Sequence, residues 1–408
     1  MKLILVLADA LKSSYLTQDN MPFLWSLSKN SRFIKRIIPS AGFCERGELF
    51  SGLDCYDTGN FSAIGYLPEF SCYHKKEWML GAIRQTSHIS EKICRRLVKW
   101  YCRHKGKVMR PYKIPVRSLG NFALTEDGDY RLTDYRTLFD VLEESGLTYS
   151  LAKFASLSGK HKMTSLNNHD FIVEATDKGI DFIPVYIGEM DYYGHHYADD
   201  IEKLKEHLLA VDSQLKDHYE QSLQAGYAFA VLGDHGMVPV KETINIFDVI
   251  DGLNIKQGKD YEIFVDSTAV RFWCYKSDIK EMIEEVLNKR LSGKGIVVNI
   301  DNYEKLRIPL DIKNSRGIPV YGDIVWMANP GVLLVPDYFN PSAKPDKGMH
   351  GYMEIDQEHG TGLFVASVQQ ATPVTSESAH LSDVCSELCS ILNIETPNPK
   401  TWKRRINQ

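Results

Sequence analysis

The segment LILVLAD (residues 3–9) is a short, uninterrupted apolar run that ends in a carboxylate. Two later segments have the same form, FIPVYIGEMD (182–191) and AFAVLGDHG (228–236). Strands that are apolar throughout, rather than alternating, are typical of a parallel sheet with helices on both faces. Helical patterns at Tyr135–Ser145 and Ala198–Ala225 lie between these runs. The sequence therefore predicts a doubly wound, mainly parallel α/β sheet.

Length, charge and cysteine content restrict the class of protein. The 408 residues suffice for one large core with inserted subdomains. A net charge of −5 gives no general attraction to nucleic acid, so an anionic ligand needs a local site. Eight cysteines without a CxxC pair indicate free thiols in a reducing compartment. The apolar run Leu3–Leu7 is too short for a secretory signal, and no membrane span is recognisable, so we expect a cytoplasmic protein.

Two segments interrupt the alternation of strands and helices. Residues 54–130 contain a basic helical segment and a loop-like tail. Residues 243–320 contain strand-like pieces and an amphipathic helix, Ile279–Leu291. We interpret both as insertions into a catalytic α/β core made of residues 1–53, 131–242 and 321–408.

Carboxylates and imidazoles gather where the predicted strands end, which is where sites form in such sheets. Six residues lie at strand ends or in a glycine-containing loop: Asp9, Asp191, His195, Asp234, His235 and His350. Their nitrogen and carboxylate oxygen atoms suit zinc, and two such ions roughly 4 Å apart can clamp the attacking and leaving oxygens of a phosphoryl transfer. An aspartate at a strand end is also a common helix N-cap. The six together favour a metal centre.

Six segments of the chain carry a family pattern: LILVLAD (3–9), PSAGFCERGELFSGL (39–53), GEMDYYGHHY (188–197), VLGDHGM (231–237), GDIVWMANPG (322–331) and MHGYMEID (349–356). In order and wording they resemble the type I phosphodiesterase/nucleotide pyrophosphatase family of the alkaline phosphatase superfamily. The resemblance spans the chain apart from the first insertion. It implies an alkaline phosphatase-like fold in which residues 243–320 form a cap subdomain.

The resemblance also implies a hydrolase with two divalent metal ions. One ion would be held by Asp191, His195 and His350, and the other by Asp9, Asp234 and His235. We expect Zn²⁺, with Mn²⁺ as the alternative, because the ligand set accommodates both. His196 and His359 are less favoured ligands.

The chain departs from the family pattern at the nucleophile. The family places a threonine, serine or modified cysteine ten residues before the glycine of an [ST]-G pair, and here that position is Gly42. A shifted register would offer Ser40 or Cys44, while attack by metal-bound water, our first choice, needs no side chain. Arg46 aligns with a position that is often basic, and could hold an ester oxygen. A surface arginine explains Arg46 equally well.

The first insertion is strongly basic from Cys94 to Arg117. An apolar stripe that includes Leu97 accompanies the charges, so this segment is expected to be an amphipathic helix. Three cations, Arg95, Arg96 and Lys99, are candidates for receiving an anionic substrate, and the segment could also contact a membrane surface peripherally. The commoner alternative is a helix packed on its own domain with solvated charges.

These features together predict hydrolysis of a phosphodiester or pyrophosphate bond in a small anionic substrate, such as a nucleotide or nucleotide sugar. Two alternatives stay open. One is a phosphomonoesterase or phosphotransferase of the same superfamily. The other is a catalytically silent protein that binds metal and a phosphorylated ligand, although retention of all six ligands argues against it.

Overall fold

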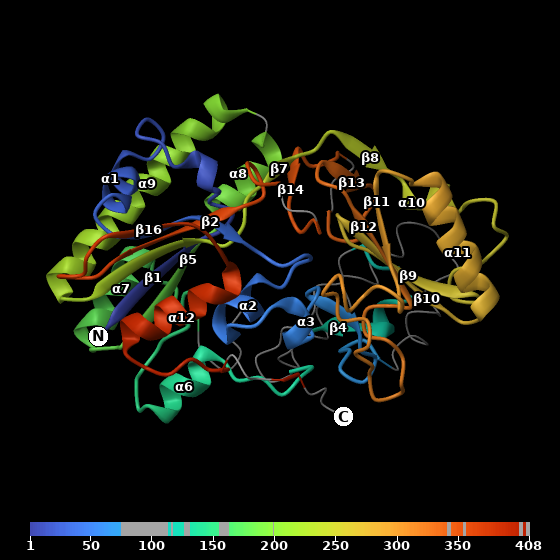
Figure 1. Ribbon diagram of the computed structural model, residues 1–408, viewed down its shortest axis with the longest axis horizontal. Helices are drawn as coiled ribbons and strands as arrows, with labels where there is room; N and C mark the ends of the chain where they lie inside the picture. Colours follow the sequence, from blue (N-terminus) through green and yellow to red (C-terminus); the bar gives the residue numbers. More distant parts are fainter. Residues whose placement is uncertain are drawn as a thin grey trace. The chain divides into compact units, whose positions relative to one another are not determined.

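The computed structural model describes residues 1–74, 113–115, 117–125, 131–154, 163–198, 200–340, 344–353, 356–399 and 403–404. The chain falls into two units, each with its own sheet (Figure 1). The first unit comprises Met1–Thr58, Asp127–Val240 and Asp346–Arg405. The second comprises Gly59–Glu126, Lys241–Pro345 and Ile406–Gln408.

The first unit is built on a six-stranded sheet with the order β16-β2-β15-β6-β1-β5. Its strands are β1 (Leu3–Ala8), β2 (Arg32–Ile38), β5 (Phe182–Ile187), β6 (Ala228–Gly233), β15 (Gly362–Ser367) and β16 (Val374–His380). The pairs β1–β5, β1–β6 and β16–β2 are parallel, and only β15 runs against its neighbours. The sequence-based prediction of a mainly parallel α/β sheet is confirmed.

Helices cover both faces of this sheet. On one face, Ile4 and Val6 of β1 pack in a core with α1 (Pro22–Ser28), α7 (Asn168–Asp177) and α9 (Ile201–Ala225). On the other face, Leu5 packs in a core with α2 (Glu45–Ser51), α6 (Leu138–Glu144) and α12 (Leu381–Leu392). Because side chains alternate along a strand, an unbroken apolar run supplies both cores. Figure 1 shows α1 and α9 on the side of the sheet opposite to α12.

The apolar face of helix α9 carries one buried charged residue, Asp212. The Asp200 side chain accepts from the Lys203 N–H at its start, and Gly226 ends it with a φ of 74°. Asp212 is buried among the apolar positions of the helix. Its carboxylate accepts from the N–H groups of Phe23 and Leu24, at 2.8 and 2.9 Å, and so satisfies donors at the start of α1.

The second unit contains an antiparallel sheet with the order β11-β12-β10-β9. Its strands are β9 (Tyr261–Val265), β10 (Ala269–Cys274), β11 (Gly295–Val298) and β12 (Ile324–Ala328), accompanied by α11 (Ser277–Arg290). Because β12 pairs with β10 and β11, residues 321–345 belong to this unit. The sequence analysis had assigned them to the catalytic core.

The remaining elements are short. They are η1 (Ser13–Tyr15), α3 (Cys55–Thr58), β3 (Ile64–Tyr66), η2 (Leu119–Asn121), β4 (Phe122–Leu124), α8 (Glu189–Tyr197), β7 (Val238–Pro239), β8 (Glu242–Ile244), α10 (Ile246–Ile250), β13 (Val332–Leu334) and β14 (Gly348–Met349). Within the described ranges no helix has the length and apolar character needed to cross a bilayer. The six described cysteines carry free thiols.

Two neighbouring leucines of α9 provide a test of this core. Leu208 is 0% exposed and Leu209 is 41% exposed. We expect Leu208→Ala to lower the free energy of unfolding by about 2–5 kcal/mol, because a buried side chain leaves a cavity. Leu209→Ala, which makes the same change in the same helix, should stay within about 0.5 kcal/mol of wild type. Urea unfolding followed by circular dichroism measures both, and equal losses would contradict the packing described here.

Candidate active site

The register of the central sheet brings two aspartates to the same level. Leu7 of β1 pairs with Leu232 of β6, so Asp9 and Asp234, each two residues further on, leave neighbouring strands side by side. The Ala10 N–H donates to Asp234 Oδ1 at 3.3 Å, which ties the two strand ends together. Strand pairing therefore places both carboxylates at one edge of the sheet.

Helix α8 presents a carboxylate and an imidazole on one face. Asp191 and His195 are four residues apart, one helical turn, and Asp191 Oδ1 lies 3.3 Å from His195 Nε2. His195 Nδ1 lies 2.8 Å from the carbonyl oxygen of Gly348, so Nδ1 carries the proton and donates it to that bond. Nε2 is then the nitrogen available to a metal ion.

His350 reaches the site from the chain that precedes β15. Because β15 is antiparallel to β6, its beginning lies at the edge where β6 ends. Strand β14 pairs with β7 and anchors the loop immediately before His350. The His350 ring stacks on the His235 ring, with centroids 3.8 Å apart and an interplanar angle of 11°. The two imidazoles are thus fixed face to face.

The glycine that follows His235 lies against the backbone of another segment. A Cβ atom on Gly236 would lie 2.0 Å from the carbonyl oxygen of His359. The Gly236 N–H donates to Gly360 O at 3.1 Å. Close backbone approach, rather than an unusual φ angle, requires glycine at this position.

The six residues singled out from the sequence converge into two sets, all within the first unit. Within each set the donor atoms lie no more than 4.8 Å from one another. The sets are Asp191, His195 and His350, and Asp9, Asp234 and His235. This division is the one that the family resemblance implied for two metal ions.

Separations between the donor atoms fit metal coordination. Tetrahedral ligands about 2.0–2.2 Å from zinc lie roughly 3.4 Å from one another, whereas hydrogen-bonded nitrogen and oxygen atoms lie within about 3.2 Å. Asp191 Oδ1 lies 3.3 Å from His195 Nε2 and 3.7 Å from His350 Nε2. In the described part of the chain, Asp191 Oδ1 has no hydrogen-bond partner. This first set therefore fits a divalent cation.

The second set concentrates negative charge away from water. Burial, and then the charge of Asp9, raise the pKa of Asp234 to about 7. Burial also acts to raise the pKa of Asp9, but a hydrogen bond from His235 and its charge hold that pKa below the usual range. Burial opposes charging of His235, yet the neighbouring carboxylates raise its pKa well above normal. Without cations, protons must neutralise this cluster.

Comparison with known protein families identifies the family to which this chain belongs. Residues 82–353 match the family model described as type I phosphodiesterase / nucleotide pyrophosphatase. The chain belongs to the type I phosphodiesterase/nucleotide pyrophosphatase family. It is accordingly a hydrolase. The matched range contains five of the six converging residues and begins after Asp9 and Gly42.

Solved structures share the fold of this family member. Human ectonucleotide pyrophosphatase/phosphodiesterase 5 is 15% identical, with a TM-score of 0.68 and coverage of 97% of this chain and 96% of that chain. The inactive murine form in complex with AMP is 16% identical, with a TM-score of 0.66 and the same coverage. At these identities the likeness concerns the fold alone.

Gly42, at the position where the family resemblance implied a nucleophile, provides no reactive side chain. Gly42 has a φ of 91°, and its N–H donates to Gly351 O at 3.1 Å. Ser40 Oγ donates to Glu48 Oε1 at 2.7 Å. Contact with Cys55 and burial raise the pKa of the Cys44 thiol well above its ordinary value. Burial raises the pKa of Glu48 to about 8, so its carboxyl group is a poor general base for Ser40 at neutral pH, and the Cys44 thiol keeps its proton. Both side chains are therefore poor nucleophiles.

Arg46 and Tyr186 surround Asp9. Arg46 Nη2 lies 3.7 Å from Asp9 Oδ2, and the Tyr186 hydroxyl donates to the same oxygen. The Arg46 guanidinium also lies 5.6 Å from the centre of the Tyr186 ring. The sequence indicated Arg46 as a candidate, whereas Tyr186, inside a strand, carried no signal of a site.

Glu45 was missed by the sequence analysis. It forms a third potential metal-binding set with His235 and His350. An acidic residue in the first turn of a helix is usually explained by the helix dipole, and Glu45 occupies that position in α2. No local pattern distinguished it.

The other candidates lie elsewhere. His196 Nδ1 lies 2.7 Å from Tyr192 O, and His359 Nδ1 lies 3.2 Å from Lys12 Nζ. Neither histidine belongs to a converging set within the described ranges. The basic residues proposed to receive substrate, Arg95, Arg96 and Lys99, lie outside the described residues.

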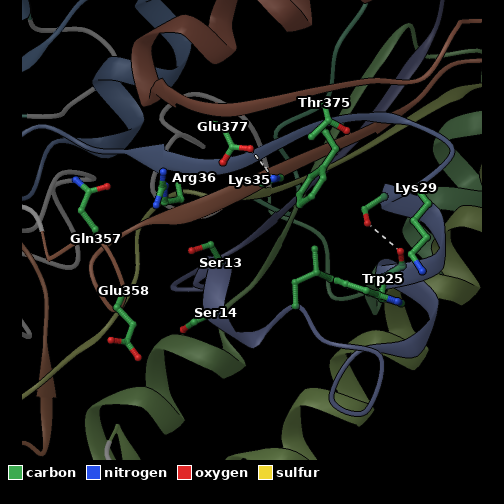
Figure 2. A pocket seen from close by; sticks show the side chains of 13 residues that line it. Ser13, Ser14, Trp25, Lys29, Lys35, Arg36, Gln357, Glu358, Thr375 and Glu377 are labelled. Carbon is green, nitrogen blue, oxygen red and sulfur yellow. Dashed lines mark hydrogen bonds and ion pairs between the residues drawn. The ribbon is translucent and has the colours of Figure 1, made fainter.

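A separate hollow of about 490 Å³ opens near β2 and α1. Apolar side chains, including Trp25 and Phe33, and an ion pair between Lys35 and Glu377 line it (Figure 2). None of the six converging residues is among its lining residues. This hollow is therefore distinct from the candidate active site.

The buried Glu48 predicts a pH dependence of stability. Burial raises its pKa from 4.5 to about 8. The folded state then retains a proton that the unfolded state releases, so this contribution to the free energy of unfolding is complete below the unfolded pKa and falls as pH rises toward 8. Glu48→Gln is neutral throughout and should flatten that fall. Urea unfolding of both metal-free proteins between pH 4.5 and about 8 measures how the free energy of unfolding changes with pH. The same slope in the two proteins would contradict a raised pKa for Glu48.

Proposed function

We propose that this family member hydrolyses a phosphodiester or pyrophosphate bond of a nucleotide or nucleotide-sugar substrate at a two-metal centre. The observation that carries the proposal is the pair of carboxylate–imidazole sets at one edge of the sheet. A murine protein of the same fold has been solved in complex with AMP, which supports a nucleotide-like ligand.

The two sets would each hold one divalent ion. Asp191, His195 and His350 would hold the first, and Asp9, Asp234 and His235 the second. Nitrogen and carboxylate oxygen donors favour Zn²⁺ and also accommodate Mn²⁺. When bound, such ions neutralise charge on phosphoryl oxygens and make water acidic enough to attack at neutral pH.

The protein residues would orient the reacting groups. The Gly348 carbonyl oxygen fixes the His195 tautomer, so Nε2 faces Asp191. Arg46 is held over Tyr186 beside Asp9, where its guanidinium would bind a phosphoryl oxygen that is not transferred. A monoanionic diester would be oriented by this cation.

Gly42 favours direct attack by water. The water oxygen would form a bond to phosphorus while the bond to the leaving oxygen breaks, and the released proton would pass to the leaving group or solvent. Ser40 and Cys44 stay as alternative nucleophiles, each disfavoured by its surroundings.

The missing nucleophile also supports a second candidate, a silent protein that binds metal and a phosphorylated ligand. A panel of bis-p-nitrophenyl phosphate, nucleotides and phosphomonoesters, with and without chelator, separates the candidates. Chelator-sensitive turnover of diesters supports our proposal, and turnover of monoesters alone favours a phosphomonoesterase. Metal binding without any turnover favours the silent protein. Substrate reception or membrane contact by the basic segment, and a cytoplasmic location, stay predictions from the sequence.

Two adjacent histidines of α8 provide a matched test. His195 belongs to a donor set, whereas the exposed His196 does not. We expect His195→Ala to lower kcat/KM for bis-p-nitrophenyl phosphate at least about 100-fold, since even outer partners of a metal ligand commonly cost 10–100-fold. His196→Ala should keep kcat/KM within about threefold of wild type. Comparable losses in the two variants would refute the assigned ligand set.

The attacking group can be identified by stereochemistry. Direct attack by water inverts the configuration at phosphorus, whereas a covalent intermediate on the enzyme retains it. With a chiral phosphorothioate diester we expect inversion, and Cys44→Ala should keep kcat within about tenfold. Retention of configuration, or a phosphorylated peptide containing Ser40 or Cys44, would show that a side chain attacks.

A further inference from the structure

Glu45 lies between the two proposed metal-binding sets. Its carboxylate, with one donor atom each from His235 and His350, forms a group within 4.8 Å. His235 belongs to one of the two sets and His350 to the other. The Glu45 side chain is only 13% exposed, so water does not fully solvate its charge.

The distance from Glu45 to His350 is typical of two ligands of one ion. Glu45 Oε1 lies 3.6 Å from His350 Nδ1. Hydrogen-bonded atoms of this kind approach within about 3.2 Å, while tetrahedral ligands of one zinc ion lie roughly 3.4 Å from one another. In the described part of the chain, His350 Nδ1 has no hydrogen-bond partner. An ion between the two atoms would satisfy both. Because Nε2 of the same ring faces Asp191, His350 would then bridge the two ions as an imidazolate.

His350 does not need Glu45 to hold its orientation. Its ring stacks on His235 at 3.8 Å between centroids. On another side it meets the edge of Phe43, with centroids 5.2 Å apart and an interplanar angle of 79°. Because these rings already fix the imidazole, orienting His350 is a weak explanation for a carboxylate at position 45.

The charge balance of the site also favours Glu45 as a metal ligand. The two sets contain three carboxylates, Asp9, Asp191 and Asp234, and Glu45 is a fourth. Before the imidazoles are counted, four carboxylates carry as much negative charge as two divalent cations carry positive charge, which reduces the cost of burying the ions. Gly42, at the family's nucleophile position, offers no side-chain oxygen, and Glu45 supplies one from the same segment.

We propose that Glu45 is a seventh ligand of the metal centre, placed between its two three-residue sets. This inference rests on the proposed function, because it requires that the site bind divalent ions.

The test compares the full-length wild type with Glu45→Gln, Glu45→Asp, Glu48→Gln and Asp234→Asn. Glu48 is a matched control, since it is a buried glutamate on the same helix that accepts from Ser40 and belongs to no donor set in the described ranges. Zn²⁺ affinity and stoichiometry are measured by competition with a chelator. The visible absorption of the Co²⁺-loaded proteins reports the ligands of the ion directly.

We expect Glu45→Gln to weaken Zn²⁺ binding at least about tenfold and to change the Co²⁺ spectrum. Glu45→Asp keeps the charge but withdraws the oxygen, so it should also change the spectrum, while Glu48→Gln should match wild type in both measurements. Loss of affinity with an unchanged spectrum would overturn ligation in favour of a purely electrostatic or orienting effect. Unchanged affinity in both Glu45 variants would overturn it as well.

The experiment distinguishes the proposed role of Glu45 from the proposed two-metal function. If Asp234→Asn loses Zn²⁺ and Glu45→Gln does not, only the role of Glu45 is refuted. If the wild type binds neither Zn²⁺ nor Co²⁺, the two-metal function itself is refuted. Circular dichroism of the metal-free variants confirms that each comparison is made between folded proteins.

Discussion

Negative charge buried at one edge of a parallel sheet is the constraint on which this site depends. The register of β1 and β6 forces Asp9 and Asp234 together, and their mutual repulsion adds to burial in raising the pKa of Asp234 to about 7. Such an arrangement is costly unless positive charge compensates it. Positive charge can come from the nearby imidazoles, from Arg46 and from the proposed divalent ions. The same carboxylates that need this compensation would hold the ions that take part in the proposed hydrolysis.

The site brings together the six residues that the family resemblance indicated, but a glycine stands where the resemblance implied a nucleophile. Six side chains converge as expected for a family member, yet Gly42 provides no nucleophile. Nearby, the Ser40 hydroxyl donates a hydrogen bond to Glu48, and the buried Cys44 has a raised pKa and keeps its proton. If water attacks in place of a side chain, the protein's task becomes orientation and charge neutralisation, which a preorganised cluster performs well.

The central strands and six converging residues were predictable because each carried a local signal: an unbroken apolar run, or a carboxylate or imidazole at its end. The direction of β15 was not, since strand direction depends on partners distant in sequence. The run IVWMA of β12 suits either sheet, so residues 321–345 were assigned to the core although β12 pairs with β10 and β11. Glu45 escaped notice because first-turn acids are common in helices without a ligand.

The antiparallel course of β15 also has a consequence for biosynthesis. It brings His350 to an edge whose other donors begin at Asp9, so the centre draws on nearly the whole length of the polypeptide. During translation, chain emerging from the ribosome cannot complete this cluster until residue 350 is outside the exit tunnel. Cation binding would therefore follow the synthesis of most of the surrounding unit, and its binding free energy would stabilise the folded unit late in assembly.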